Sequence, residues 1–167
     1  MLSREQIETA FARLNDELAR VDQRAELFLV GGAVMCLVYN ARPSTNDIDG
    51  WFSNATVVRN AADRIGSELG LDANWLNDAA KGFLPDVVGK EAWRDYGHLS
   101  VSVADAPTLL AMKCLAARSN EDVGDIRFLA GVLGLCTAAE VLTAILRYYP
   151  EERFPVRSRL LLEEMFG

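Results

Sequence analysis

Two aspartates one residue apart, Asp47 and Asp49, are the residues whose type and spacing best suit chemistry. On a β-strand their side chains would project from one face, about 6.5–7 Å apart along the chain. Two like charges on one face are unfavourable unless a cation lies between them. Mg²⁺ usually takes one or two protein carboxylates, with phosphates and water as its other ligands. The pair therefore predicts a magnesium site, in which two metal ions could act on a phosphoryl group. The alternative is a solvated strand end with two charges.

A pair of glycines, Gly31 and Gly32, follows the apolar run 25–30. A strand that ends in two glycines and turns directly into a helix leaves backbone N–H groups bare where the helix dipole favours anions. Glycine also lets a phosphate approach closely, because it has no Cβ. The glycines therefore predict a phosphate-binding turn or, as the alternative, a tight turn without a ligand.

Two other motifs built on Asp-x-Asp fit this segment less well. An EF-hand loop starting at Asp47 needs an oxygen ligand at its fifth position and glycine at its sixth, where the sequence has Trp51 and Phe52. Asp47-Ile-Asp-Gly50 also resembles the nucleophile motif of haloacid-dehalogenase-type phosphatases. In that family an apolar strand leads into the first aspartate, whereas residues 42–46 here form a polar segment.

The two motifs together resemble a known superfamily. Leu27-Phe-Leu-Val-Gly-Gly-Ala, followed by Arg42-Pro-Ser-Thr-Asn-Asp-Ile-Asp, is similar to nucleotidyltransferases of the polymerase-beta type. More narrowly, it resembles a small bacterial branch that includes abortive-infection toxins. Residues 109–118 resemble the lysine-bearing helix of that branch, residues 122–129 resemble its downstream aspartate motif, and residues 75–84 also look like this group. The resemblance spans residues 27–129 in separate segments.

The resemblance implies a nucleotide site in the first half of the chain. Gly31 and Gly32 would hold the triphosphate of a nucleotide, and Asp47 and Asp49 would bind Mg²⁺. The expected substrate is a nucleoside triphosphate (NTP), and a two-ion magnesium site is the expected cofactor.

The resemblance also assigns roles outside these motifs, with one departure. Arg42 and Thr45 would contact the nucleotide or fix the loop before the aspartates. Lys113 would contact phosphate, and Asp125 would complete the site or orient Lys113. Many members of the superfamily carry a third carboxylate on a later strand, but the candidate strand 98–103 has none. The general base is therefore not evident from the sequence.

Lys113 lies in an otherwise apolar helical stretch, so its ammonium group must reach water or meet an anion. Asp122 and Asp125 are three positions apart and share a helical face. The alternative is that one of the aspartates forms a structural ion pair with Lys113 or Arg118, which is compatible with a supporting role in the site.

The elements that must position these residues follow from periodicity and capping signals. A small mixed sheet followed by helices predicts an α+β fold, and the resemblance makes the sheet a nucleotidyltransferase core. Residues 1–105 would form that core and residues 106–167 a helical part packed on it, as one compact unit. Expected helices are 4–20, 33–39, 56–69, 106–118, 121–134, 138–148 and 156–166; expected strands are 25–30, 47–52 and 98–103; residues 71–97 are expected to be turns with short elements.

Composition limits the class of protein. The 167 residues carry a net charge of −7, which repels nucleic-acid backbones at long range. Cys36, Cys114 and Cys136 are unclustered, as expected for reduced core thiols. The charged N-terminus does not resemble a signal peptide, and no apolar run is long enough to cross a membrane. We therefore expect a cytoplasmic protein with no membrane partner.

Together these features predict a magnesium-dependent enzyme that transfers a nucleoside monophosphate from an NTP to an acceptor hydroxyl. The acceptor could be tRNA, a protein or a small molecule. The alternative is a non-catalytic member that binds a nucleotide or a cognate partner protein, for example as one component of a toxin–antitoxin pair.

Overall fold

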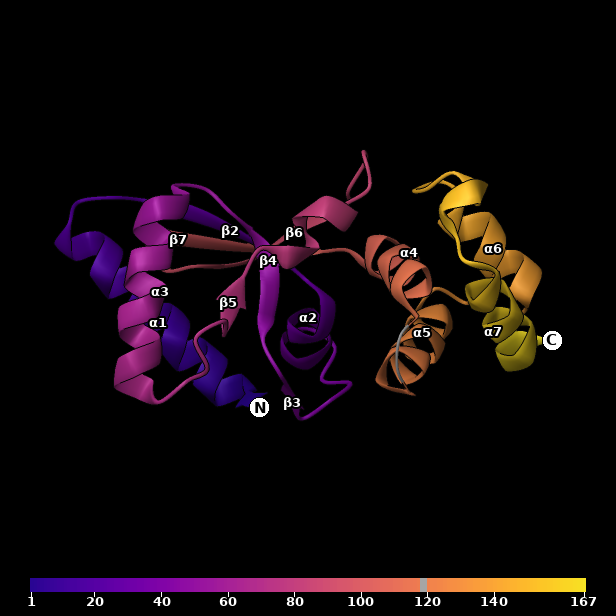
Figure 1. The fold of residues 1–167 in the computed structure, drawn as a ribbon, viewed down its shortest axis with the longest axis horizontal. Coiled ribbons are helices and arrows are strands. Elements are labelled where there is room, and N and C mark those ends of the chain that lie inside the picture. The colour runs from indigo at the N-terminus through magenta and orange to yellow at the C-terminus, as the bar shows by residue number, and fades with distance from the viewer. Residues whose placement is uncertain (118–119) are drawn as a thin grey trace. The chain divides into compact units, whose positions relative to one another are not determined.

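A computed structural model describes residues 1–117 and 120–167, and the fold is α+β (Figure 1). The described residues contain seven α-helices, a mixed five-stranded sheet and a small antiparallel sheet. The chain forms two compact units. Unit 1 comprises Met1–Gly82 and Lys90–Val103, and unit 2 comprises Phe83–Gly89 and Ala104–Gly167. The division falls beside the boundary expected at residue 105. That the helical part packs on the core as one compact unit stays a prediction.

Unit 1 is built around the five-stranded sheet, whose strand order is β5-β4-β2-β7-β6. β2 pairs antiparallel with β4 and parallel with β7, and β4 pairs parallel with β5. A two-stranded sheet joins β1 to β3. The strands are β1 (Leu2–Ser3), β2 (Ala25–Val30), β3 (Ser44–Thr45), β4 (Ile48–Phe52), β5 (Leu76–Asn77), β6 (Lys90–Asp95) and β7 (Leu99–Ala104).

Two long helices pack against each other beside this sheet, α1 (Arg4–Arg20) and α3 (Ala55–Leu69) (Figure 1). α1 begins at the expected capping box, in which Ser3 and Gln6 bond to each other's backbone N–H groups. α3 ends at Gly70, whose φ of +65° favours glycine. The short helix α2 (Gly31–Leu37) lies on the other side of β4 from α1 and α3 (Figure 1).

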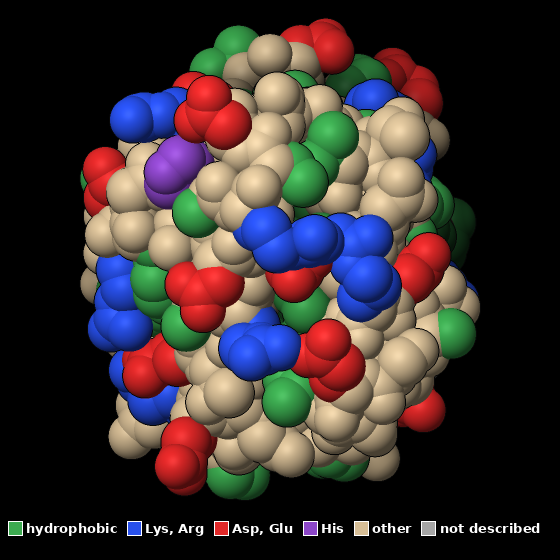
Figure 2. Space-filling model, turned by 90° about the vertical axis from the view of Figure 1, so that its left-hand side faces the viewer, with side chains coloured by type: hydrophobic (Ala, Val, Ile, Leu, Met, Phe, Trp, Pro, Cys, Tyr) green, Lys and Arg blue, Asp and Glu red, His purple; other side chains and the backbone are tan. Residues whose placement is uncertain are grey.

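The face of unit 1 drawn in Figure 2 mixes basic and acidic side chains. Unit 1 contains ion pairs in which Arg13 pairs with Glu68, and both Arg20 and Arg64 pair with Glu17. Hydrogen bonds from Arg20 and then Arg64 hold the pKa of Glu17 below its ordinary value. Exposed pairs of this kind add little stability. The face drawn in Figure 2 shows basic and acidic side chains side by side, without the single-signed patch that attracts a nucleic acid.

Unit 2 is a set of helices: α4 (Ala106–Ala116), α5 (Asn120–Val132), α6 (Ala138–Ile145) and α7 (Val156–Phe166). Two 3-10 turns are also present in the chain, η1 (Ala79–Phe83) and η2 (Glu151–Arg153). The side chain of Asp105 caps α4 by accepting from the Thr108 N–H at 2.9 Å. Thr137 and Glu140 form the second expected capping box, at the start of α6. Both caps agree with the sequence signals that predicted them.

The expected helices and strands are confirmed, with corrections at boundaries and in the middle segment. α2 begins at Gly31 rather than Ala33, and α6 ends at Ile145, before the expected Tyr148. Residues 71–97 contain a six-residue strand, β6, that the sequence did not predict. α4 ends at Ala116, before the expected Arg118, which itself falls outside the described residues. No described helix is long and apolar enough to cross a membrane.

The three cysteines are not all core residues. Cys36 and Cys114 are buried, but Cys136 is exposed, so its expected place in the core is wrong. Burial raises the pKa of Cys114 to about 12 and also raises the pKa of Cys36. Since the thiolate is the reactive form, both buried thiols should be unreactive while the chain is folded.

We expect a thiol-specific reagent at pH 8 to modify one cysteine rapidly in the folded protein and all three after unfolding. Absorbance of the released thiolate counts the reacted groups. Cys136→Ser is the control and should remove the rapid phase. Rapid modification of either remaining thiol in the folded Cys136→Ser protein would contradict the burial of Cys36 and Cys114.

Candidate functional site

The pairing of β2 with β4 brings the second aspartate to the glycine turn. In the antiparallel register, Val30 is opposite Asp49, and Gly31 follows Val30 directly. Gly31 has a φ of +68°, and a Cβ placed on it would lie 3.8 Å from Asp49 Oδ2. The carboxylate of Asp49 is therefore next to the backbone of the turn. The positive φ also gives Gly31 a conformational reason to be glycine.

Asp47 lies just before β4, with its side chain partly buried. Between the two aspartates, Ile48 is fully buried, which agrees with the expected alternation. Oδ2 of Asp47 accepts a hydrogen bond from Nδ2 of Asn77 at 3.0 Å. Among the described residues this carboxylate receives no other hydrogen bond. It is thus oriented by a neutral donor.

Gly32 is in contact with the loop that precedes the aspartates. A Cβ placed on Gly32 would lie 2.6 Å from Thr45 Oγ1 and 3.1 Å from Arg42 Nη1. Thr45 is 4% exposed, and its hydroxyl donates to the carbonyl oxygen of Asp47 at 3.1 Å. The absent Cβ of Gly32 therefore makes room for side chains of this chain. That finding supplies a structural reason for glycine besides the expected approach of a phosphate.

Asn77 was not identified from the sequence, although it contacts the site. It is the register partner of Asp49 on β5, and it bonds to Asp47 across the strand pair. Its Oδ1 accepts from the Ala79 N–H at 3.0 Å, and its Nδ2 also donates to the carbonyl oxygen of Asn74 at 3.2 Å. The sequence offered one usable signal, because Asn commonly accepts from the N–H two residues later in a turn.

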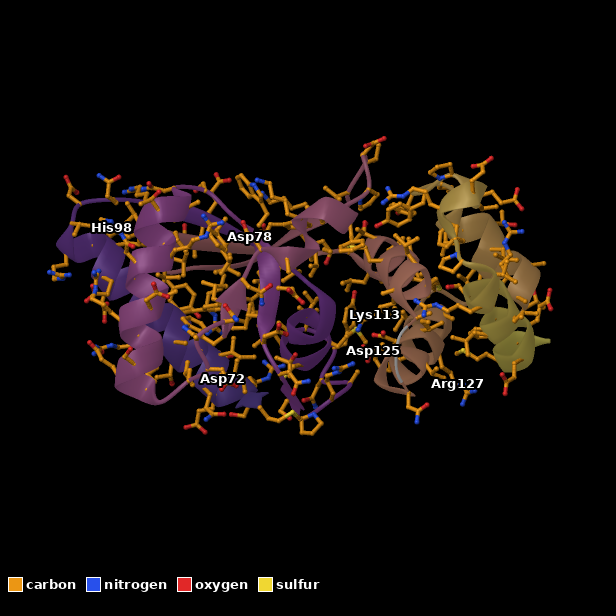
Figure 3. The ribbon with its side chains drawn as sticks, in the orientation of Figure 1. Asp72, Asp78, His98, Lys113, Asp125 and Arg127 are labelled. Atoms are coloured by element: carbon orange, nitrogen blue, oxygen red, sulfur yellow. The ribbon has the colours of Figure 1, made fainter. Side chains whose placement is uncertain are left out.

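In unit 2, Lys113 forms ion pairs with two aspartates. Nζ of Lys113 on α4 lies 2.7 Å from Asp122 Oδ1 and 2.8 Å from Asp125 Oδ2, both on α5. The three side chains are 12%, 11% and 6% exposed, respectively. Figure 3 shows Lys113 and Asp125 close together. The ion-pair alternative is therefore confirmed for both aspartates, and Asp125 does contact Lys113. A contact of Lys113 with phosphate stays a prediction.

Other candidate residues have structural contacts. His98 lies at the turn before β7, where its Nδ1 is 2.9 Å from the carbonyl oxygen of Gln23 (Figure 3). Trp75 is buried in the core and donates to the carbonyl oxygen of Ala62. Within unit 1, the predicted site residues that lie together are Gly31, Gly32, Arg42, Thr45, Asp47 and Asp49; within unit 2, Lys113 and Asp125 lie together.

The donor set suits Mg²⁺ only if a substrate supplies further ligands. Across residues 1–117 and 120–167, no three or more His, Cys, Asp or Glu side chains are grouped as a metal site. Asp47 and Asp49 are hard oxygen ligands, and Mg²⁺ commonly binds one or two such carboxylates together with phosphates. The pair therefore fits a metal that arrives with a nucleotide, and it does not fit a site made of protein ligands alone.

We predict that Gly32→Ala lowers the free energy of unfolding by about 1–3 kcal/mol, because the new methyl group overlaps the buried hydroxyl of Thr45. Urea unfolding of the full chain measures the loss. In a Thr45→Ala background, which removes that hydroxyl, the same change should cost less. An equal cost in both backgrounds would mean that the two residues are not in contact.

We also predict that Lys113→Met lowers the free energy of unfolding by about 3–5 kcal/mol, since it removes the ammonium group that pairs with two largely buried carboxylates. The matched control is Arg159→Met, which removes the cation of an exposed pair with Glu151 in the same unit. Its cost should be about 0–1 kcal/mol. Similar losses for the two variants would contradict a buried network around Lys113.

Comparisons with known proteins do not assign this site. No family model, curated protein or solved structure matches the chain. Its function must therefore be inferred from the residues and distances described above.

Proposed function

We propose that this protein is a magnesium-dependent nucleotidyltransferase, which transfers a nucleoside monophosphate from an NTP to an acceptor hydroxyl. Asp47 and Asp49 bind the metal, and the turn at Gly31 and Gly32 holds the triphosphate. The observation that carries the proposal is the position of Asp49, whose Oδ2 lies 3.8 Å from the point where a Cβ on Gly31 would be. A metal bound by Asp49 and a phosphate bound at the turn would be neighbours.

Local charge supports the same assignment. Two carboxylates within two residues repel each other, and a divalent cation relieves that repulsion. The guanidinium group of Arg42 lies beside Gly32, since its Nη1 is 3.1 Å from the position of a Cβ on that glycine. A planar cation is a good partner for phosphate oxygens. The turn thus has an anionic side at Asp49 and a cationic side at Arg42, which suits a metal–triphosphate complex.

The proposed reaction is a phosphoryl transfer. The acceptor oxygen forms a bond to the α-phosphorus, the bond from that phosphorus to the bridging oxygen breaks, pyrophosphate leaves, and the hydroxyl proton passes to solvent. Mg²⁺ neutralises charge on the phosphate oxygens when it is bound. The chain contributes mainly by positioning: Asp47 and Asp49 hold the metal, and Gly31, Gly32 and Arg42 orient the phosphates.

Thr45 fixes the loop before the aspartates in this scheme. It is buried, it contacts Gly32, and it donates to the backbone of Asp47. Lys113 has a structural role in unit 2 through its pairs with Asp122 and Asp125. That Lys113 and Asp125 also take part in phosphate binding is a proposal, which mutation of these two residues would test.

The proposal does not choose the acceptor of the nucleoside monophosphate among tRNA, a protein and a small molecule. The net charge of −7 disfavours long-range attraction of RNA. An RNA acceptor would therefore need local contacts or a partner protein.

A second candidate function is non-catalytic binding of a nucleotide or of a cognate partner protein. It is favoured by the two-carboxylate donor set, because the described residues hold no group of three metal-binding side chains. Such a protein would bind the metal–nucleotide complex without turnover. Binding and turnover must therefore be measured separately.

We predict that Asp49→Asn weakens binding of Mg²⁺ with a non-hydrolysable NTP at least 10-fold, because it removes one of two carboxylate ligands. Calorimetry measures the binding. Asp63→Asn, on the exposed side of α3, is the control and should bind like the wild type. The same variants are then compared for transfer of radiolabel from an α-labelled NTP to tRNA, protein and small-molecule acceptors.

Labelling by the wild type and by Asp63→Asn, but not by Asp49→Asn, would support the enzyme. Binding without labelling of any acceptor class would favour the second candidate. Equal binding by wild type and Asp49→Asn would contradict both, since the nucleotide would then not depend on this carboxylate.

A further inference from the structure

The side chain of Asn77 makes three hydrogen bonds, one of which goes to a carboxylate oxygen of Asp47. Its Nδ2 donates to Asp47 Oδ2 at 3.0 Å and to the carbonyl oxygen of Asn74 at 3.2 Å. Its Oδ1 accepts from the Ala79 N–H at 3.0 Å. Both ends of the amide are therefore engaged, which fixes which end faces Asp47.

The position of Asn77 in the sheet places it beside both aspartates. β5 runs parallel to β4, and Asn77 is the register partner of Asp49. Residues opposite each other on paired strands have their side chains on the same face. Asn77 thus lies on the face that carries the carboxylates, and it bridges diagonally to Asp47.

The chemical type of this donor matters. An arginine or lysine beside Asp47 would orient the carboxylate but also cancel its charge, and it would compete with a metal ion. A neutral amide orients one oxygen and leaves the negative charge in place. Among the described residues, Asp47 receives no side-chain hydrogen bond except the one from Asn77, so no described donor is bonded to its Oδ1.

We propose that Asn77 is the positioning residue of the metal site: its amide clamps Oδ2 of Asp47, so that Oδ1 is presented to a divalent cation shared with Asp49. This inference rests on the proposed function, because it assumes a metal at the aspartate pair. It adds a residue on β5 to a site otherwise built from the β2 turn, β4 and the loop before β4.

Two substitutions at Asn77 distinguish loss of the hydrogen bond to Asp47 from loss of the hydrogen bond with the Ala79 N–H. Asn77→Ala removes both the donor to Asp47 and the acceptor for Ala79. Asn77→Asp keeps an acceptor for Ala79 but puts an oxygen where the donor was, 3.0 Å from Asp47 Oδ2 in the present geometry. Without metal, the new carboxylate repels Asp47, and with metal it adds an anionic group to the site. Asn74→Ala is the matched control, since Asn74 contributes only its backbone carbonyl to Asn77.

The test is a calorimetric titration of the full chain with the Mn²⁺ complex of a non-hydrolysable NTP, because the aspartate pair suits a metal that arrives with a nucleotide. Thermal unfolding is measured with and without the same complex. We expect Asn77→Ala to weaken binding of this Mn²⁺ complex about 10- to 100-fold, as is typical when a residue that orients a metal ligand is lost. Asn74→Ala should bind like the wild type. Asn77→Asp should bind Mn²⁺ at least as tightly as the wild type, with a lower unfolding midpoint that Mn²⁺ restores.

The outcomes distinguish failure of the proposed role of Asn77 from failure of the proposed metal site. If the wild type binds Mn²⁺ and both Asn77 variants bind within threefold of it, with no change in the effect of Mn²⁺ on unfolding, the clamp is refuted while the proposed function stands. If the wild type and Asn74→Ala do not bind the Mn²⁺ complex of the non-hydrolysable NTP, the metal site is refuted and the clamp with it. Thermal unfolding of Asn77→Ala itself shows whether its loss of binding comes from misfolding, because a folded variant keeps a cooperative transition.

Discussion

The antiparallel pairing of β2 with β4 is the constraint on which the candidate site depends. It sets Asp49 opposite Val30 and therefore next to Gly31. A shift of one residue would turn Ile48, now fully buried, towards solvent and drive the aspartates into the core. Exposing one isoleucine costs about 1.5–3 kcal/mol, and burying an unpaired carboxylate costs considerably more. The hydrophobic core of unit 1 thus fixes the register, and the register fixes the distance between a carboxylate and a glycine turn.

The protein satisfies its buried or partly buried carboxylates in two different ways. In unit 2, Asp122 and Asp125 share the ammonium group of Lys113, so much of their charge is balanced within the chain. In unit 1, the one side-chain hydrogen bond that the described residues give to the Asp47 carboxylate comes from the neutral amide of Asn77. A carboxylate that is oriented but not neutralised is suited to an external cation. The first arrangement joins two helices. In the function that we propose, the second leaves a carboxylate that a metal ion would balance.

Local sequence signals were enough for the elements and for part of the site. Capping residues and helical periodicity predicted α1, α3 and the helices of unit 2, and alternation predicted the strand that carries Asp49. β6 could not be predicted, because its side chains are mostly exposed and show no apolar alternation. Asn77 was missed because its contact with Asp47 spans thirty positions and depends on the pairing of β5 with β4. The packing of Thr45 and Arg42 against Gly32 is likewise a tertiary contact. Sequence spacing alone cannot reveal such contacts.

The most direct test of the central claim is a crystal structure of the protein grown with Mn²⁺ and a non-hydrolysable NTP, with data collected at the manganese absorption edge. Anomalous difference density locates the metal without reference to any assumed ligand. We predict a peak between the carboxylates of Asp47 and Asp49, with the triphosphate against Gly31 and Gly32. A fully occupied metal and nucleotide bound elsewhere, with the two aspartates in contact with neither, would contradict the account.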